Sequence, residues 1–201
     1  DYLSKGAING ARLAAVCDIE PDKLAGFRGN DAKKFEDSGK MLRSGLVDAV
    51  LIATPHYAHT TVGIEAFQNG INVLTEKPIS VHKRDCEKLI AAYKASRGTV
   101  FGAMFQMRTV PLHAKVRSMV RSGELGKIRR INWIVTDWFR SQAYYSSGGW
   151  RATWRGEGGG VLMNQCPHNL DLLQWICGMP SKVEAHCAFG KFHDIEVEDV
   201  V

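Results

Sequence analysis

The chain has 201 residues, of which 45% are hydrophobic and 23% charged, as expected for a globular protein with one sizeable core or two smaller ones. The sequence contains neither an apolar run long enough to cross a bilayer nor a signal-peptide pattern, so no membrane partner is predicted. The net charge of +5 is mild and the lysines and arginines are scattered, so no nucleic-acid partner is predicted, although the basic balance favours an anionic ligand.

The cysteines and the two ends of the chain give two further expectations. The five cysteines are an odd set without a C-x-x-C pair, which indicates a reducing compartment and hence the cytoplasm. The chain starts at Asp1, residues 1–8 resemble the second half of a helix, and residues 196–201 resemble the start of a strand with no partner after it. We therefore expect the chain to be a piece of a longer protein.

In the first half of the chain, apolar strands alternate with helical segments. Helices are expected to begin at Pro21, to end at Gln68 before Asn69-Gly70, and to span residues 83–96. The predicted strands cover residues 11–17, 48–53, 70–74 and 100–105. This alternation predicts βαβ units and a parallel sheet, and the wholly apolar run 48–53 predicts a strand buried on both faces.

After residue 105 the pattern changes. Helices are predicted over residues 111–122 and 161–177, alternating strands over 127–139 and 181–192, and a loop over 141–160. Alternating strands suit an antiparallel sheet with one solvated face. The fold class is therefore an α/β nucleotide-binding domain over residues 1–105, followed by an α+β domain with a mostly antiparallel sheet over residues 106–201.

Lys77 lies where the strand 70–74 must end, because Pro78 cannot continue a sheet ladder. In open α/β sheets, ligands bind outside the carboxyl ends of the strands. Lys77 is therefore a candidate proton donor or substrate-orienting cation, and the alternative is an ordinary solvated lysine.

Asp18 follows the first predicted strand. In a dinucleotide-binding domain, an acid at this position accepts hydrogen bonds from the adenosine ribose, whereas the alternative is a turn or helix-capping aspartate. The glycine-rich phosphate loop expected before it is absent from the chain. The only G-x-G, Gly156 to Gly158, leads into no βαβ unit and is not that loop.

The loop after the strand 48–53 carries Thr54, Pro55, His56 and His59. The threonine hydroxyl and the first amides of the following helix are placed to meet a cofactor. The His-x-x-His spacing could indicate a metal pair, but no cysteine or acid cluster supports one, and no metal is predicted.

Asn164 and His168 are four residues apart, and therefore on one face if the segment is helical, although Pro167 favours a helix start between them. The imidazole of His168 is suited to moving a proton near neutral pH, and the alternative is a structural histidine. Trp150-Arg151 could stack on a planar ring or hold an anion, or could only anchor its loop.

Together these residues resemble the Gfo/Idh/MocA family of sugar and cyclitol oxidoreductases, across essentially the whole chain. The motifs that carry the resemblance are Glu76-Lys77-Pro78, Thr54-Pro55 with His59, and the segment from Gly158 through Asn164 to His168 and Asp171. The resemblance implies a Rossmann domain without its first strand and glycine-rich loop, and an incomplete second domain for substrate binding and homo-oligomerisation as a dimer or tetramer.

The resemblance also implies the activity and the site. The activity is hydride transfer between a nicotinamide cofactor and a hydroxyl-bearing carbon of a sugar or cyclitol. Lys77 and His168 are the implied catalytic and substrate-binding residues. The residues implied to lie near the cofactor are Asp18, Thr54, Pro55, His59, Glu76, Lys77, Trp150 and Arg151.

One position departs from the family. Many polyol-oxidising members carry an aspartate where this chain has Asn164, and an amide cannot accept a proton as a carboxylate does. We therefore expect Lys77 and His168 to share the proton transfer and Asn164 to bind a substrate hydroxyl. NAD is expected in preference to NADP, because the Asp18 carboxylate would repel a 2′-phosphate.

Two alternatives stay open. The first is an enzyme that uses tightly bound NAD transiently in net non-redox chemistry, such as glycoside cleavage or epimerisation. The second is a non-catalytic nucleotide-binding protein on the same fold. The presence of both Lys77 and His168 argues against the second alternative, because a scaffold needs neither.

Overall fold

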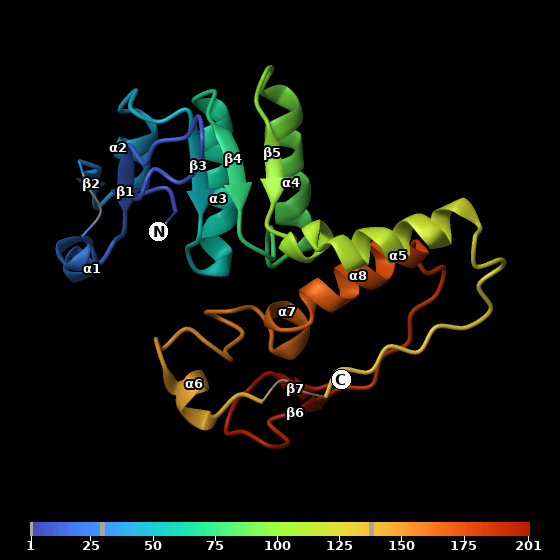
Figure 1. Cartoon of the computed structure of the whole chain (residues 1–201). Helices are drawn as coiled ribbons and strands as arrows, with labels where there is room; N and C mark the ends of the chain where they lie inside the picture. The colour runs from blue at the N-terminus through green and yellow to red at the C-terminus, as the bar shows by residue number, and fades with distance from the viewer. Residues whose placement is uncertain (1, 29–30, 137–138) are drawn as a thin grey trace. The chain divides into compact units, whose positions relative to one another are not determined.

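The computed structural model describes residues 2–28, 31–136 and 139–201 (Figure 1). It divides into two compact units. The first comprises Asp1–Thr54, Ala58–Glu76 and His82–Gly102, and the second comprises Pro55–Tyr57, Lys77–Val81 and Ala103–Val201. Among the described residues, no helix is long and apolar enough to cross a membrane.

The strands of the first unit are short and form two sheets. β1 (Ala15–Cys17) pairs in parallel with β2 (Lys33–Phe35), a strand that the sequence pattern did not predict because two of its three residues are exposed lysines. The second sheet has the order β3 (Ala49–Ile52), β4 (Asn72–Thr75) and β5 (Phe101–Ala103), and β3 pairs in parallel with β4. The arrows of β4 and β5 point the same way in Figure 1.

The described part of the first unit has four helices. They are α1 (Pro21–Gly26), α2 (Ser38–Leu42), α3 (His56–Gln68) and α4 (Lys83–Ala95). The sequence marks the start of α1, the end of α3 and the bounds of α4, but not α2. The predicted end of α3 at Gln68 and the predicted start of α4 at Lys83 are confirmed. Gly70, which follows α3, has a φ of 71°, a backbone conformation that glycine adopts without steric cost.

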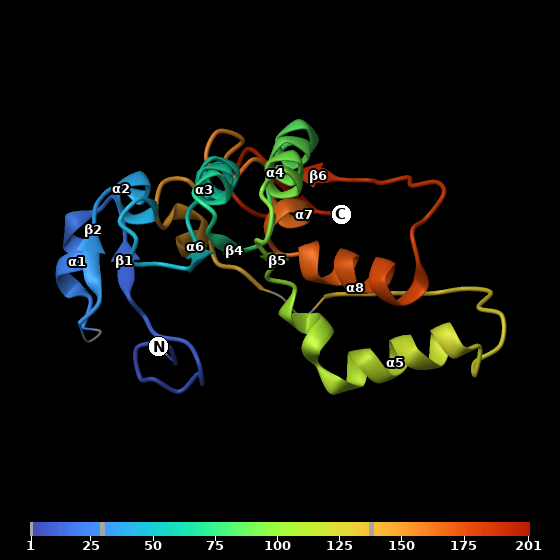
Figure 2. The same ribbon diagram turned by 90° about the horizontal axis from the view of Figure 1, so that it is seen from above.

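Helices α3 and α4 cover one face of the three-stranded sheet, and Figure 2 shows both on the same side of β4 and β5. Gly63 of α3 packs against the side chains of Leu89 and Ile52, both of which are buried. On the opposite face, Leu51 is 52% and Leu74 is 37% exposed. The prediction that the strand 48–53 is buried on both faces is therefore wrong, because both helices lie on one side.

The second unit is built mainly from helices. They are η1 (Gln106–Thr109), α5 (Pro111–Ser122), α6 (Gln142–Ser146), α7 (Val161–Asn164) and α8 (Pro167–Cys177), and α5 lies along α8 (Figure 1). The predicted helix 111–122 is confirmed, and Gly123 ends it in the left-handed conformation. The predicted helix 161–177 is interrupted at Gln165 and Cys166, so Asn164 and His168 lie in different helices.

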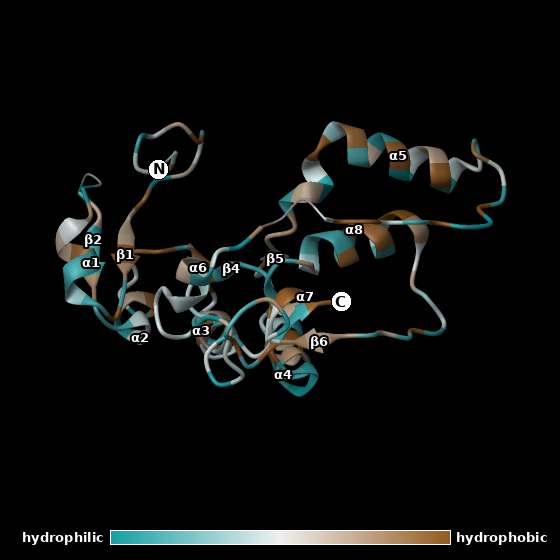
Figure 3. Cartoon of the chain, turned by 90° about the horizontal axis from the view of Figure 1, so that it is seen from below, coloured by the Kyte–Doolittle hydropathy of each residue, from teal (hydrophilic) through white to brown (hydrophobic). Residues whose placement is uncertain are grey.

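The predicted strand 127–139 is wrong over the residues that the structure describes. Residues 127–136 and Phe139 belong to no helix or strand, and residues 137–138 lie outside the description. The segment carries exposed apolar side chains such as Trp133 and Ile134, and Figure 3 shows hydrophobic residues along it. Alternating polarity suits one face of a sheet, but a strand exists only when a neighbouring strand supplies its hydrogen bonds.

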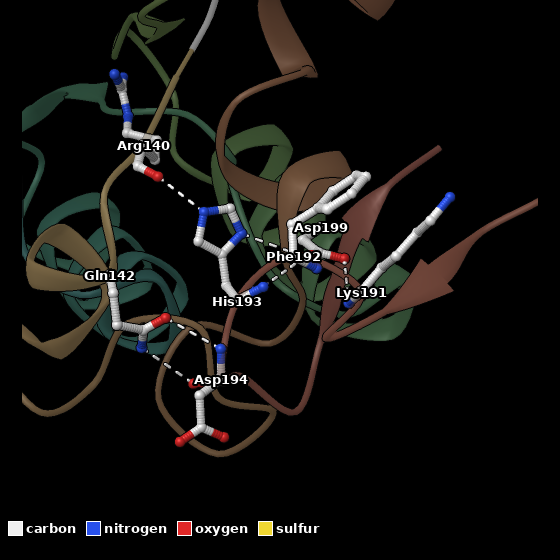
Figure 4. Close-up of polar contacts among 7 residues, drawn as sticks. All are labelled: Arg140, Gln142, Lys191, Phe192, His193, Asp194 and Asp199. Atoms are coloured by element: carbon white, nitrogen blue, oxygen red, sulfur yellow. Dashed lines mark hydrogen bonds and ion pairs between the residues drawn. The ribbon is translucent and has the colours of Figure 1, made fainter.

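The end of the chain forms a small antiparallel pair, β6 (Ala188–Phe189) with β7 (Glu198–Val200). The predicted strand 181–192 is thus reduced to two residues, and β7 has the partner that the sequence did not indicate. The Asp199 carboxylate stabilises the connection by accepting the backbone N–H groups of Lys191, Phe192 and His193, and the Nδ1 atom of His193 (Figure 4).

Candidate functional site

The Lys77 ammonium group is held in the second unit. Lys77 follows the last residue of β4 by two positions, and the peptide bond from Lys77 to Pro78 is cis. The Nζ atom donates to the backbone oxygen of Asn164 at 2.5 Å and lies 3.2 Å from its side-chain Oδ1. Lys77 is half-buried, so the alternative of an ordinary solvated lysine does not describe it.

Asn164 is contacted at both ends of its side chain. Its Oδ1 faces Lys77, and its Nδ2 donates to Oε1 of Glu157. Glu157 is only 2% exposed, and its Oε2 accepts the backbone N–H of Ala152 at 2.7 Å. Sequence reasoning missed Glu157. The signal that could have revealed it is a single acid inside the glycine-rich run 156–160.

The glycines around Glu157 allow a close approach of backbone segments. A side chain at Gly158, whose φ is 84°, would meet Val81, and a side chain at Gly160 would meet the backbone of Glu198. Glu198 itself is buried and accepts the backbone N–H groups of Gly160 and Leu162, each at 3.0 Å. The end of the loop that leads into α7 is thereby fixed.

The two histidines of the Thr54 loop contact backbone carbonyl oxygens. In the second unit, His56 is 5% exposed, and its Nδ1 lies 2.9 Å from the carbonyl oxygen of Glu157. In the first unit, His59 is 1% exposed, and its Nε2 lies 2.8 Å from the carbonyl oxygen of Thr54. Within the described parts of the chain, no group of three histidines, cysteines or acids gathers where it could hold a metal ion.

His168 lies in the first turn of α8, and its ring meets Phe105 edge-on with 6.2 Å between the ring centroids. The Gln106 carboxamide is 3.5 Å from its Nε2. The helix is tied to η1 by a bidentate ion pair, in which Arg108 donates to Asp171 at 2.8 and 2.5 Å. This hydrogen bonding raises the pKa of Arg108, against the opposing effect of burial. Sequence reasoning missed Arg108.

Arg151 of the Trp150-Arg151 pair packs against two aromatic rings and also borders a hollow. The Arg151 guanidinium stacks on the rings of Tyr144 and Trp150 at 4.6 and 4.7 Å, and donates to the Tyr144 hydroxyl at 2.9 Å. With Gln142 and Asp194, Arg151 lines a hollow of about 500 Å³. The stacked guanidinium is thus rigidly placed.

In the first unit, Asp18, Thr54 and Glu76 all follow strand ends. Asp18 comes directly after β1, and its Oδ1 accepts the backbone N–H of Glu20 at 2.9 Å, the turn geometry that was the alternative reading. Thr54 and Pro55, two and three residues beyond β3, are exposed. The backbone N–H of Glu76 donates to the backbone oxygen of Ile52 at 2.8 Å, and this bond extends the pairing of β3 with β4.

Family models match nearly the whole chain. Residues 4–103 match the model described as an oxidoreductase family with an NAD-binding Rossmann fold, and residues 113–201 match the GFO/IDH/MocA C-terminal domain. The chain belongs to the GFO/IDH/MocA family of oxidoreductases. The predicted fold class, a Rossmann-type parallel sheet followed by a domain with antiparallel strands, is confirmed.

The relatives extend beyond this chain. The rhizopine catabolism protein MocA of Rhizobium meliloti is 31% identical over 83% of this chain and 49% of its own length. An inositol 2-dehydrogenase of Rubrobacter xylanophilus is 28% identical over 84% of this chain and 46% of its own. The WlbA dehydrogenase of Chromobacterium violaceum, solved with NADH and UDP-GlcNAcA, is 32% identical with a TM-score of 0.86, over 98% of this chain and 56% of its own. The chain thus spans about half the length of the curated relatives it matches.

Proposed function

We propose that the protein is an NAD-dependent dehydrogenase that transfers a hydride between the nicotinamide and a hydroxyl-bearing carbon of a sugar or cyclitol. The observation that carries this proposal is the Lys77 ammonium group, half-buried and oriented by two oxygens of Asn164. A lysine at the end of a parallel strand, held in one orientation, is suited to donating or accepting the hydroxyl proton. The family membership and the named relatives support the redox chemistry and the polyol substrate.

The residues divide the work as follows. Asp18 would hold the adenosine ribose. His59 fixes the backbone of Thr54. The residues that would contact the rest of the cofactor are Thr54, Pro55, Glu76, Lys77, Trp150 and Arg151. The nicotinamide supplies the hydride transfer. Lys77 and His168 move the hydroxyl proton. Asn164 also binds the substrate, because its oxygen and its amide group each keep a second hydrogen-bonding position beyond Lys77 and Glu157.

The fit of a dinucleotide rests on the donor and acceptor set. Asp18 is half-buried at a strand end. Its Oδ1 accepts the backbone N–H of Glu20, and its Oδ2 lies 4.0 Å from the Nζ of the exposed Lys23. A carboxylate suits the paired hydroxyls of a ribose and repels a phosphate in the same place, which favours NAD over NADP.

Two further properties belong to this proposal. All five cysteines are free thiols, which supports a reducing, cytoplasmic location. Family resemblance supports a homo-oligomer, and apolar side chains exposed along residues 128–135 are candidates for such an interface.

The test uses the full gene product with NAD and NADP against a panel of sugars, cyclitols and keto-sugars. We expect turnover with a net change in nicotinamide absorbance, and a lower dissociation constant for NAD than for NADP. Product formed without a net absorbance change would favour the net non-redox alternative. Cofactor binding without any turnover across the panel would favour the non-catalytic alternative.

A further inference from the structure

Glu157 is a buried carboxylate to which the proposed mechanism gives no role. Its side chain has two kinds of partner, the backbone N–H of Ala152 on Oε2 and the side-chain amide of Asn164 on Oε1. A carboxylate removed from water needs compensating hydrogen bonds and a nearby opposite charge. The backbone amide supplies only a hydrogen bond. The other partner of Glu157 is Asn164, and the positive charge that Asn164 contacts is that of Lys77.

The contact with Glu157 fixes which end of the Asn164 amide faces Lys77. An ionised carboxylate only accepts hydrogen bonds, so the amide must present its NH₂ group to Glu157. Its oxygen therefore faces away from Glu157, and Oδ1 lies 3.2 Å from Nζ of Lys77. The chain of contacts thus runs from an ammonium group through a neutral amide to a carboxylate, and each of these contacts joins a donor to an acceptor.

Glu198, in β7, shows what a purely structural acid against the same loop looks like. It is also buried, and its Oε1 accepts the backbone N–H groups of Gly160 and Leu162. Both of these partners are backbone groups, which makes Glu198 a clamp for the start of α7. Glu157 differs because one of its partners is a side chain that contacts Lys77.

We propose that Glu157 is a positioning residue for Lys77, supplying through Asn164 the negative charge that orients and stabilises the ammonium group. This inference rests on the proposed function for its effect on turnover. It assigns to Glu157 no contact with substrate. The proposal predicts that a carboxylate near Lys77 matters more than the position that supplies it. The charge can therefore be moved from position 157 to position 164.

The experiment compares three variants of the full gene product. In E157Q the carboxylate is neutralised, and in E157Q/N164D it is moved to position 164. E198Q is the control for neutralising another buried acid against this loop, whose two backbone donors meet a single oxygen that a glutamine keeps. We expect E157Q to lower kcat at least about tenfold with an unchanged dissociation constant for NAD. The relocated charge in E157Q/N164D should raise kcat at least about threefold above that of E157Q, while KM changes because residue 164 also binds the substrate. E198Q should change kcat less than E157Q.

Equal losses of kcat in E157Q and E198Q, or no recovery in the relocated-charge variant, would overturn the proposal. If E157Q fails to fold, the relocated-charge variant decides alone, because it restores a carboxylate but not the side chain of Glu157. Failure of that variant to fold would assign Glu157 a structural role and overturn the proposal.

A second readout does not depend on turnover and separates this inference from the proposed function. The urea midpoints of E157Q, K77M and E157Q/K77M form a double-mutant cycle. We expect the double variant to shift the midpoint by less than the sum of the two single shifts, whereas E198Q and K77M should be additive. Additive shifts for E157Q and K77M would overturn the inference. Coupled shifts in a protein that turns over no sugar or cyclitol would reject the proposed function alone.

Discussion

Replacing Asp199 with asparagine should destabilise the second unit by an amount that can be worked from its contacts. The Asp199 side chain is fully buried. Its Oδ1 accepts the backbone N–H of Lys191 at 2.9 Å. Its Oδ2 contacts three nitrogens, the backbone N–H of Phe192 at 2.7 Å and the backbone N–H and ring Nδ1 of His193, each at 3.2 Å. An asparagine has one accepting oxygen. In its better orientation that oxygen replaces Oδ2, and the Lys191 N–H then faces an NH₂ group.

The cost has two parts. A buried N–H left without an acceptor costs about 1–3 kcal/mol, and the three remaining bonds lose their charge assistance, about 0.5 kcal/mol each. We expect D199N to lower the free energy of unfolding by about 3 kcal/mol at pH 7. D194N is the matched control, because it removes the same charge from an exposed neighbour in the same turn, and should cost less than about 0.5 kcal/mol.

The pH dependence follows from the direction of the pKa shift. Burial by itself would raise the pKa of Asp199, but the hydrogen bonds from Phe192, Lys191 and His193 outweigh it and hold the pKa below the ordinary value of 3.8. The stability that this group contributes is therefore complete above about pH 5, where the unfolded-state carboxyl is ionised, and is lost as the pH falls through the lowered pKa.

Urea unfolding between pH 7 and pH 2 measures both effects. The difference between the parent and D199N should be constant from pH 7 to about pH 5 and should shrink in stronger acid. A difference that stays constant down to pH 2, or a D199N variant no less stable than D194N, would refute the reasoning from the Asp199 contacts.

Three other outcomes follow from the described contacts. K77M should reduce kcat by at least about 10²-fold while the circular dichroism spectrum stays unchanged, and a variant that keeps a tenth of the activity would exclude a role of Lys77 in proton transfer. D171N should lower the free energy of unfolding by about 1–3 kcal/mol, because its partner Arg108 is 38% exposed and partly screened, and a chemical denaturation curve that matches the parent would contradict this. Burial, and to a lesser degree the charge of Glu198, raises the pKa of the Cys166 thiol, whereas Cys177 is exposed. Mass spectrometry of maleimide-treated protein should therefore find Cys177 labelled well before Cys166.

The elements that could be predicted from the sequence are those whose signals are local. Gln68 ends α3 because Asn69-Gly70 follows it, and Gly123 ends α5 in the left-handed conformation. The segment 127–139 has an equally regular pattern, yet residues 127–136 form no strand. A helix makes its hydrogen bonds within itself, whereas a strand depends on a neighbour that periodicity does not reveal.

The site could be predicted in part for the same reason. Lys77 and Asn164 were each recognised from their own neighbours in the sequence, one before a proline and the other before a helix start. Their contact joins residues 87 positions apart, so no local pattern could reveal it. For Asn164 and His168 the local pattern left two arrangements open. The helix start that Pro167 favours between them is the one observed, so the two residues lie in different helices.

Glu157 has little signal in the sequence, because a glycine-rich run is typical of a phosphate-binding turn and this one leads into no βαβ unit. Its glycines serve packing instead, since side chains at Gly158 and Gly160 would collide with Val81 and with the backbone of Glu198. A loop pressed so closely against its neighbours leaves little room for water around a charged side chain. An acid kept in such a loop must therefore have fixed partners, and those of Glu157 lead through Asn164 to Lys77. This chain lacks the carboxylate that many family members carry at position 164, and the carboxylate of Glu157 contacts Asn164 instead.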